Sequence, residues 1–153
     1  MGELVLRFTR EHDAEPELFS LLHWALASLN AGTSPKRIAA LFHLRFLDTT
    51  GYRPALNGCG ICNFPVSVKR SFALHPGSGG LICNRCRQKD PVFQPGLSVQ
   101  TLKFLQNAQW LDLQRLHRLQ LPAKAADETL KALYHYTRHL LQQDIHSWKF
   151  IRL

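Results

Sequence analysis

The chain has 153 residues, of which 45% are hydrophobic and 20% are charged, and its formal net charge is +8. A chain of this length and hydrophobic content can bury one core, which excludes an intrinsically disordered protein. Charged residues interrupt every apolar run before it reaches the roughly twenty residues of a membrane-spanning helix. We therefore predict a soluble, cytoplasmic protein without a membrane partner.

The positive charge lies almost entirely after residue 20. Residues 1–20 contain five acidic and two basic residues, so the other 17 basic and 6 acidic residues give the rest of the chain a net charge of +11. Such an excess favours binding to a polyanion such as nucleic acid. The alternative interpretation is a charged surface that only maintains solubility.

Three helices are predicted in the first third of the chain. Residues 3–9 look like the end of a helix without a capping residue, so we expect the chain to begin at an artificial boundary. A second helix begins at Pro16 and ends before Gly32, and a third begins at Pro35 after the preferred N-cap residue Ser34. The third helix is apolar nearly all round, which predicts a central position in a helical bundle. The expected buried residues are Leu18, Phe19, Leu22, Ala25, Leu26 and Leu29 in the second helix and Ile38, Leu41, Phe42, Leu44, Phe46 and Leu47 in the third.

All four cysteines lie in two C-x-x-C motifs, Cys59 to Cys62 and Cys83 to Cys86, which twenty residues separate. Each motif directs two sulfurs to one side of a tight turn, and two such turns supply the four thiolates of a tetrahedral, structural Zn²⁺ site. Two disulfides would need an oxidising compartment, and no signal peptide opens the sequence. A thioredoxin-like redox pair would need a βαβ unit, and none is visible. We predict one structural Zn²⁺ ion bound by Cys59, Cys62, Cys83 and Cys86.

The interval between the two motifs predicts a short ribbon of strands. Apolar and polar residues alternate around Val66 and Val68 and again around Phe72 and Leu74. Asn63, directly after the first motif, tolerates the positive φ that such a turn often needs. An interval of this size is too small to form a core of its own, so metal binding should stabilise it.

Helices are also predicted after the second motif. Ser98 is the expected N-cap of one helix, and an apolar pattern continues over residues 113–119 to the break at Pro122. A long last helix is predicted over residues 124–142. Its expected stripe is Ala126, Leu130, Leu133, Tyr134, Thr137, Leu140 and Leu141.

These elements predict a mainly α fold, a helical bundle with an inserted four-cysteine zinc ribbon. We expect one domain made of a helical part (1–56), the zinc-ribbon insertion (57–90) and a second helical part (91–153).

Signs of catalysis are lacking in the sequence. Its carboxylates are scattered and form no acid and base pair, and it has no P-loop, dinucleotide-binding glycine pattern or G-x-S-x-G motif. His135 and His139 have the i, i+4 spacing of a metal-binding pair but lack the glutamate of H-E-x-x-H, and His139 is interpreted as a packing residue. We predict that the protein is not an enzyme and takes no small-molecule substrate.

The two cysteine motifs have characteristic flanking residues. The run Gly51-Tyr52-Arg53-Pro54 leads into the first motif, and Gly79-Gly80 precedes the second. In these features the sequence resembles the C-terminal part of RecO, a family of bacterial recombination mediators. The likeness continues at Leu97-Ser98, His139-Leu140 and Ser147-x-x-Phe150, so it covers nearly the whole chain. The family also carries an N-terminal OB-fold that binds DNA, which the residues before Glu3 cannot supply. The chain is therefore expected to be a fragment or a truncated paralogue.

The resemblance implies a role in recombinational repair in the bacterial cytoplasm, at the nucleoid during repair. The implied partners are single-stranded DNA, the C-terminal tail of single-stranded-DNA-binding protein, and RecR, with which the family helps RecA to load. Two other classes stay open. One is an RNA-associated or transcription-associated zinc ribbon, for which only Phe72 is placed to stack on a base. The other is a protein–protein adaptor that does not bind nucleic acid.

Two sets of residues are candidate binding sites. The predicted nucleic-acid contacts form the basic rim of the ribbon, Lys69, Arg70, Arg85, Arg87 and Lys89, for which a solvated charged face is the alternative.

The predicted partner site lies at the start of the helix at Pro35. Lys36 and Arg37 oppose the helix dipole there, so an acidic group is expected to bind, with Phe42 and Arg45 supporting it. The family supplies an acidic, Phe-ending tail as a suitable ligand. The alternative is that Lys36 and Arg37 are simply solvated.

Overall fold

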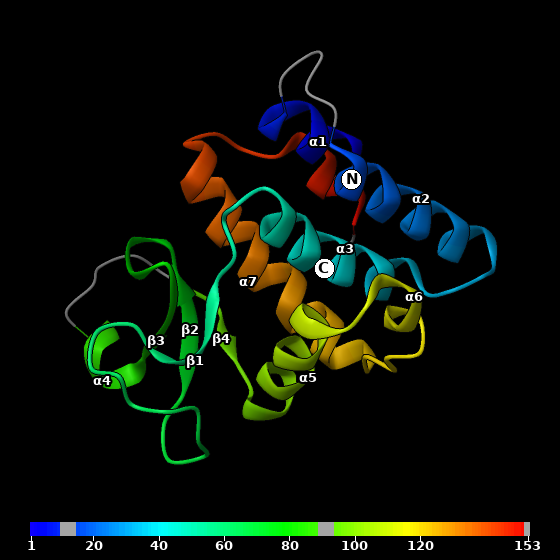
Figure 1. Cartoon of the computed structure of the whole chain (residues 1–153). Coiled ribbons are helices and arrows are strands. Elements are labelled where there is room, and N and C mark those ends of the chain that lie inside the picture. Colours follow the sequence, from blue (N-terminus) through cyan, green and yellow to red (C-terminus); the bar gives the residue numbers. More distant parts are fainter. Residues whose placement is uncertain (10–14, 89–93, 152–153) are drawn as a thin grey trace.

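Helix α3 (Pro35–Thr49) runs through the middle of the molecule, as Figure 1 shows. The coordinates are a computed structural model, which describes residues 1–9, 15–88 and 94–151. Nine of the fifteen residues of α3 are buried, which confirms the predicted central position. The helices are α1 (Gly2–Phe8), α2 (Pro16–Asn30), α3, α4 (Asn84–Arg87), α5 (Val99–Trp110), α6 (Leu113–Leu116) and α7 (Ala123–Leu141), with 3₁₀ turns η1 (Pro76–Ser78) and η2 (His146–Phe150).

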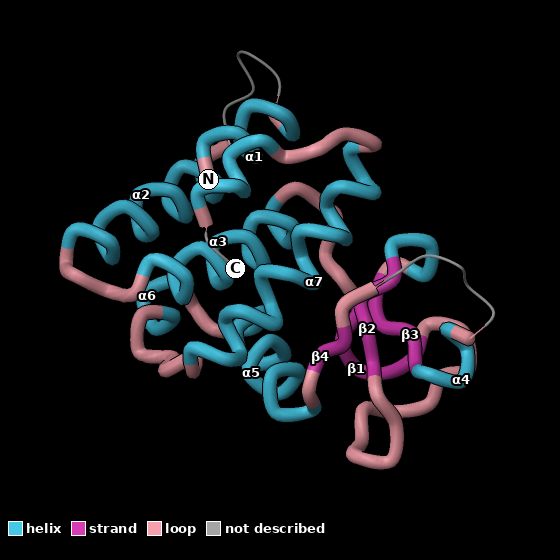
Figure 2. Tube along the Cα trace, turned by 180° about the vertical axis from the view of Figure 1, so that it is seen from behind, coloured by secondary structure: helices cyan, strands magenta, loops and turns pink. Residues whose placement is uncertain are grey.

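Helices α2 and α7 pack on either side of α3, and a small sheet lies at one end of this bundle (Figures 1 and 2). The predicted mainly α fold is therefore confirmed. Ser98 caps α5 as predicted, because its hydroxyl accepts a hydrogen bond from the backbone N–H of Thr101. Among the residues that the structure describes, no helix has the length and apolar character needed to cross a bilayer.

The buried face of α2 agrees with the predicted one at Leu18 and Ala25 but differs from it at other positions. Leu18, Leu21 and Ala25 are buried, whereas Phe19 is 73% exposed and Leu26 is 55% exposed. The helix carries apolar residues on two faces, and it lies at the edge of the bundle, where only one face meets α3. Periodicity alone could not tell which of the two faces would be covered.

The sheet has four strands in the order β1-β3-β2-β4. Strands β2 and β3 form an antiparallel hairpin, β1 pairs with β3 in parallel, and β4 pairs antiparallel with β2. Gly79, at φ +64°, closes the hairpin turn after η1. The strands are β1 (Ala55–Cys59), β2 (Phe72–His75), β3 (Gly80–Cys83) and β4 (Gly96–Leu97).

The predicted ribbon was wrong in two respects. Val66 and Val68 lie in no strand, and Val68 is 88% exposed, because the pairing ends at the isolated bridge between Pro65 and Gly58 and the chain then turns at Val68 and Lys69. Phe72 does lie in a strand, but it is 1% exposed and cannot present a face for stacking a base. The predicted division into three parts stays a prediction, and the strands extend past the limits of the expected insertion to Ala55 and Leu97.

Sheet and helices share one hydrophobic core. Phe72 and Leu81 of the sheet belong to the same buried cluster as Leu102 of α5 and Leu130 of α7. The last helix spans Ala123–Leu141, within one residue of the predicted bounds. His139 is exposed, so its interpretation as a packing residue is wrong.

Among the histidines that the structure describes, the buried one is His43 of α3, which is 1% exposed. Its Nε2 lies 2.7 Å from the hydroxyl of Thr137 on α7, and its ring packs edge-on against Trp148. Burial lowers the pKa of His43 to about 3, and the positive amino terminus contributes in the same direction. The imidazole is therefore neutral in the folded protein at physiological pH.

This burial predicts a loss of stability in mild acid. The pKa of His43 is near 6.5 when unfolded and about 3 when folded, so the stabilisation is complete above pH 6.5 and declines as the pH falls towards 3. Between pH 7 and pH 5, the His43 contribution to the unfolding free energy should fall by about 2 kcal/mol. Urea denaturation at several pH values measures this change in the unfolding free energy.

The variant His43→Gln is the matched control, because it keeps an N–H for Thr137 but has no proton to gain. Its unfolding free energy should depend on pH less steeply than that of the parent protein. Parallel pH profiles for the two proteins would contradict the assignment.

Candidate metal centre

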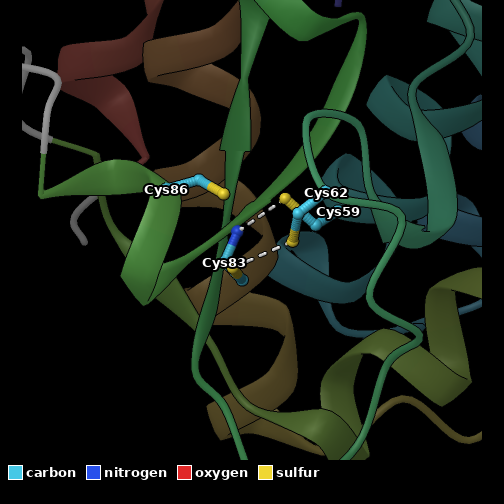
Figure 3. Close-up of side chains that lie close together, drawn as sticks. All are labelled: Cys59, Cys62, Cys83 and Cys86. Carbon is cyan, nitrogen blue, oxygen red and sulfur yellow. Dashed lines mark hydrogen bonds between the residues drawn. The ribbon is translucent and has the colours of Figure 1, made fainter.

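The sheet brings the two cysteine motifs together. Cys59 ends β1 and Cys83 ends the neighbouring β3, so the first cysteine of each motif comes from adjacent strands. After Cys62 the chain turns at Asn63, which has φ +54° as predicted, and Cys86 lies in the short helix α4. Figure 3 shows the four cysteine side chains converging from these two segments on a common space.

The spacing of the sulfurs fits a tetrahedral metal site. All four lie within 4.8 Å of one another, and Cys62 Sγ is 3.7 Å from Cys83 Sγ. A Zn–S bond of about 2.3 Å places the sulfurs of a tetrahedral site about 3.8 Å apart. No disulfide joins the four cysteines, so the structure does not favour the disulfide alternative. In the described part of the chain, no other group of three His, Cys or acidic side chains is placed to bind a metal, and His135 with His139 forms none.

The environment of the sulfurs favours thiolates at part of the cluster. Burial raises the pKa of Cys83, but hydrogen bonds from the Cys86 backbone N–H, the Arg70 side chain and neighbouring thiols outweigh it and lower this pKa to about 6. Burial likewise opposes ionisation of Cys59, yet backbone N–H groups, including that of Cys83 at 3.4 Å, lower its pKa. Burial and the neighbouring sulfurs raise the pKa of Cys86 to about 12. Because the four sulfurs lie so close together, ionisation of all four thiols is unfavourable unless a cation binds between them.

The basic rim is less uniform than predicted. Arg70 turns back to the sulfurs, with its Nη1 3.4 Å from both Cys62 Sγ and Cys83 Sγ. Arg87 donates a hydrogen bond to the Gln94 backbone carbonyl at 3.1 Å. Lys69 and Arg85 are exposed. The fifth predicted residue, Lys89, lies outside the described residues.

The predicted partner site at the start of α3 is largely used inside the chain. The Lys36 ammonium lies 2.7 Å from an Asp127 carboxylate oxygen of α7, so the chain itself supplies the negative group expected there. Arg37 donates to the Gln120 side chain at 2.8 Å. Phe42 is completely buried, which leaves it no side-chain surface for an exposed contact.

Arg45 is also committed to an internal role. Its Nη1 donates to the backbone carbonyls of Ala108 and Leu111, at 3.0 and 2.6 Å, at the end of α5. These carbonyls have no partner within the helix, and a cation is favourable at that end of the dipole. The role of Arg45 in binding a partner stays a prediction, and its guanidinium already has these internal acceptors at the end of α5.

Sequence reasoning missed an apolar cavity beside Pro35. The cavity has a volume of about 280 Å³ and is lined by residues from both ends of the chain, including Leu4, Leu29, Trp148 and Phe150. Such a cavity has no local sequence signal, because its walls come from segments more than a hundred residues apart. Only the apolar tail at residues 145–151 indicated that something packs there.

The chain is similar to known proteins over nearly its whole length. The family model "Recombination protein O C terminal" matches residues 1–149. DNA repair protein RecO of Syntrophus aciditrophicus is 30% identical over 151 residues, which are 97% of this chain and 58% of that protein. RecO of Roseiflexus is 32% identical over 150 residues, 98% of this chain and 52% of that protein. RecO of Bacillus subtilis is 34% identical over 128 residues, 84% of this chain and 49% of that protein.

The chain thus spans about half the length of these relatives. The resemblance expected from the cysteine motifs and their flanking residues is confirmed. The chain belongs to the RecO family of DNA repair proteins and corresponds to its C-terminal region.

Proposed function

We propose that this chain is the part of a RecO-type recombination mediator that holds partners together and performs no catalysis. The match of residues 1–149 to the RecO C-terminal model carries this proposal, and the sulfur cluster formed by the motifs supports it. The proposed partners are single-stranded DNA, the acidic tail of single-stranded-DNA-binding protein, and RecR, in the bacterial cytoplasm and at the nucleoid during repair. We assign no residues to RecR.

The proposed cofactor is one structural Zn²⁺ ion. Cys59, Cys62, Cys83 and Cys86 supply four sulfurs at tetrahedral spacing, and a fourfold thiolate set selects zinc over harder cations such as Mg²⁺ or Ca²⁺. Bound zinc would cross-link the two motifs and leave no open position for substrate. Its role is therefore structural.

Protein purified under reducing conditions without added metal should contain one equivalent of zinc per chain, as measured by elemental analysis. Replacing Cys83→Ser removes one of four ligands, so the variant should lose zinc and its amides in residues 55–86 should exchange hydrogen faster. Parent protein treated with a chelator is the control and should show the same exchange pattern. Zinc well below one equivalent in folded parent protein would contradict the proposal.

The proposed contact with single strands uses the exposed cations of the rim. Lys69 and Arg85 are both exposed and lie close in sequence to the motifs that the cluster joins. Arg87 contributes less, because it already donates to Gln94. With two or three phosphates neutralised, the logarithmic salt dependence of binding should be about −1.5 to −2.

The double variant Lys69→Glu with Arg85→Glu should weaken binding to a labelled single-stranded oligonucleotide by about tenfold at low salt and flatten the salt dependence. The matched control is Arg115→Glu with Arg118→Glu, which changes the net charge equally at the α6 end of the bundle (Figure 1). Equal losses in the two double variants would show that net charge alone matters. If the parent protein does not bind the oligonucleotide, the alternative function of a protein–protein adaptor would be favoured.

The proposed site for the acidic, Phe-ending tail is the cavity beside Pro35. Apolar side chains such as Leu29 and Trp148 line it, so it can take a phenyl ring, and Phe150 at its edge is 78% exposed. Lys149 is exposed next to it, and Lys36 lies one residue beyond Pro35. Lys149 can pair with an acidic residue of the tail, whereas Lys36 contributes less, because it already pairs with Asp127 at 2.7 Å.

The variant Phe150→Ala should weaken binding of the tail peptide by about 1 to 2 kcal/mol, measured by fluorescence anisotropy, because it removes apolar contact area. The variant Lys149→Gln should also weaken binding of the tail peptide and make this binding less sensitive to salt.

Arg37→Gln is the control for these variants. Arg37 follows Pro35 by two residues, about half a turn of helix, so it lies on the opposite side of α3 from the cavity. A peptide without its terminal Phe should bind far more weakly. Equal affinity of the two peptides would remove the cavity from the proposal.

A further inference from the structure

Arg70 makes an unusual set of contacts for a residue of the basic rim. Its Nη1 lies 3.4 Å from Cys62 Sγ of the first motif and 3.4 Å from Cys83 Sγ of the second. The carbon of its guanidinium lies 3.6 Å from the centre of the Phe64 ring. One cation is therefore held against sulfurs from both motifs and against an aromatic face.

The surrounding backbone holds Phe64 and Arg70 in this arrangement. The Phe64 carbonyl accepts a hydrogen bond from the Cys59 N–H at 2.9 Å, which ties Phe64 to the first motif. A side chain at Gly58 would collide with that carbonyl, so a glycine is required there. The Ser71 carbonyl, next to Arg70, accepts from the Asn84 N–H at 2.9 Å, which ties the neighbouring backbone to the second motif.

The contact of Arg70 with the sulfurs can stabilise the negative charge of a metal-bound cysteine cluster. Four thiolates around a divalent cation carry a net charge of −2, and N–H groups that donate to charged sulfur reduce the repulsion between them. Groups that donate to metal ligands commonly change metal affinity 10- to 100-fold. Stacking on Phe64 limits the motion of the guanidinium, so little further ordering is needed when it donates.

The solvent exposure of the cysteines indicates where a chelator or an oxidant can reach the metal centre. Cys62 is an exposed residue, whereas Cys59 and Cys83 are buried. A chelator or an oxidant from solvent therefore reaches the cluster first at Cys62. Arg70 contacts that sulfur.

We propose that Arg70 is a positioning residue of the metal centre, which holds the Cys62 and Cys83 sulfurs together and slows the loss of the metal through the exposed side. This inference rests on the metal binding proposed above. It also removes Arg70 from the predicted phosphate contacts, because its guanidinium is engaged by sulfur.

The test is the rate at which zinc passes from the protein to a chromogenic chelator in excess. Arg70→Gln should accelerate this transfer about 10- to 100-fold. The transfer rate of Arg70→Lys should lie between those of the parent protein and of Arg70→Gln, because an ammonium keeps the charge but cannot stack on Phe64 as a planar guanidinium does. Lys69→Gln, which removes the neighbouring positive charge, is the matched control and should leave the rate unchanged.

Two further measurements separate this role from others. Far-ultraviolet circular dichroism checks that each variant is folded, and Phe64→Leu should accelerate transfer moderately while leaving Arg70 in place. With zinc in excess, Arg70→Gln should bind the single-stranded oligonucleotide as the parent protein does.

The outcomes distinguish this inference from the proposal on which it rests. Parental transfer rates in both Arg70 variants, or equal acceleration in Lys69→Gln, would overturn the role of Arg70 and leave the zinc site intact. A parent protein that binds no metal would overturn both.

Discussion

The close approach of β1 to β3 is the contact on which the metal centre depends. A side chain at residue 80 would collide with the backbone of Ala55, so the parallel pairing of these strands requires Gly80. Backbone hydrogen bonds on either side, from the Ala55 N–H to the Gly79 carbonyl and from the Gly60 N–H to the Leu81 carbonyl, maintain the approach. Without it, the ends of the two strands could not present Cys59 and Cys83 to the same space. The glycines that precede the second motif therefore serve strand pairing as well as the turn.

Much of the positive charge of this chain is used within the fold. Arg45 binds the carbonyl end of α5, and Lys36 pairs with Asp127. Arg53 pairs with Asp48 at 3.2 Å and stacks on the exposed Trp110 ring, with 4.2 Å between its guanidinium carbon and the ring centre. A high net charge indicates that a polyanion is a plausible class of partner, but it does not identify the residues that bind it. Those residues can be chosen only after the internal partners are known.

The features that could be predicted from sequence are those that depend on short-range spacing. The positive φ of Asn63, the Ser98 cap and the ends of α7 follow from residues within a few positions of one another. The cysteine cluster follows from two motifs of four residues each, although twenty residues separate them. What could not be predicted is which surface an element buries, as with Phe19 of α2, and which internal partner a charge finds, as with Arg45. These outcomes depend on helices that are distant in sequence, and α2 offered two apolar faces of similar character. The cavity beside Pro35 could not be predicted for the same reason.

The shared core also determines how far the effect of the metal extends. The β2 and β3 residues Leu74, Leu81 and Ile82 are buried in the same cluster as α3 and α7 residues, so apolar packing supports the hairpin independently of the sulfurs. The segment from Gly60 to Arg70 has no strand and no fully buried residue, and apart from the cluster it is connected to the rest by a few backbone contacts, at Gly60, Phe64, Pro65 and Val66. Removing the metal should therefore loosen this segment and the Cys86 helix first, while the bundle keeps its packing. A metal bound at the four cysteines would order the surface that carries Lys69 and Arg85, and the helices provide the packing that supports this surface.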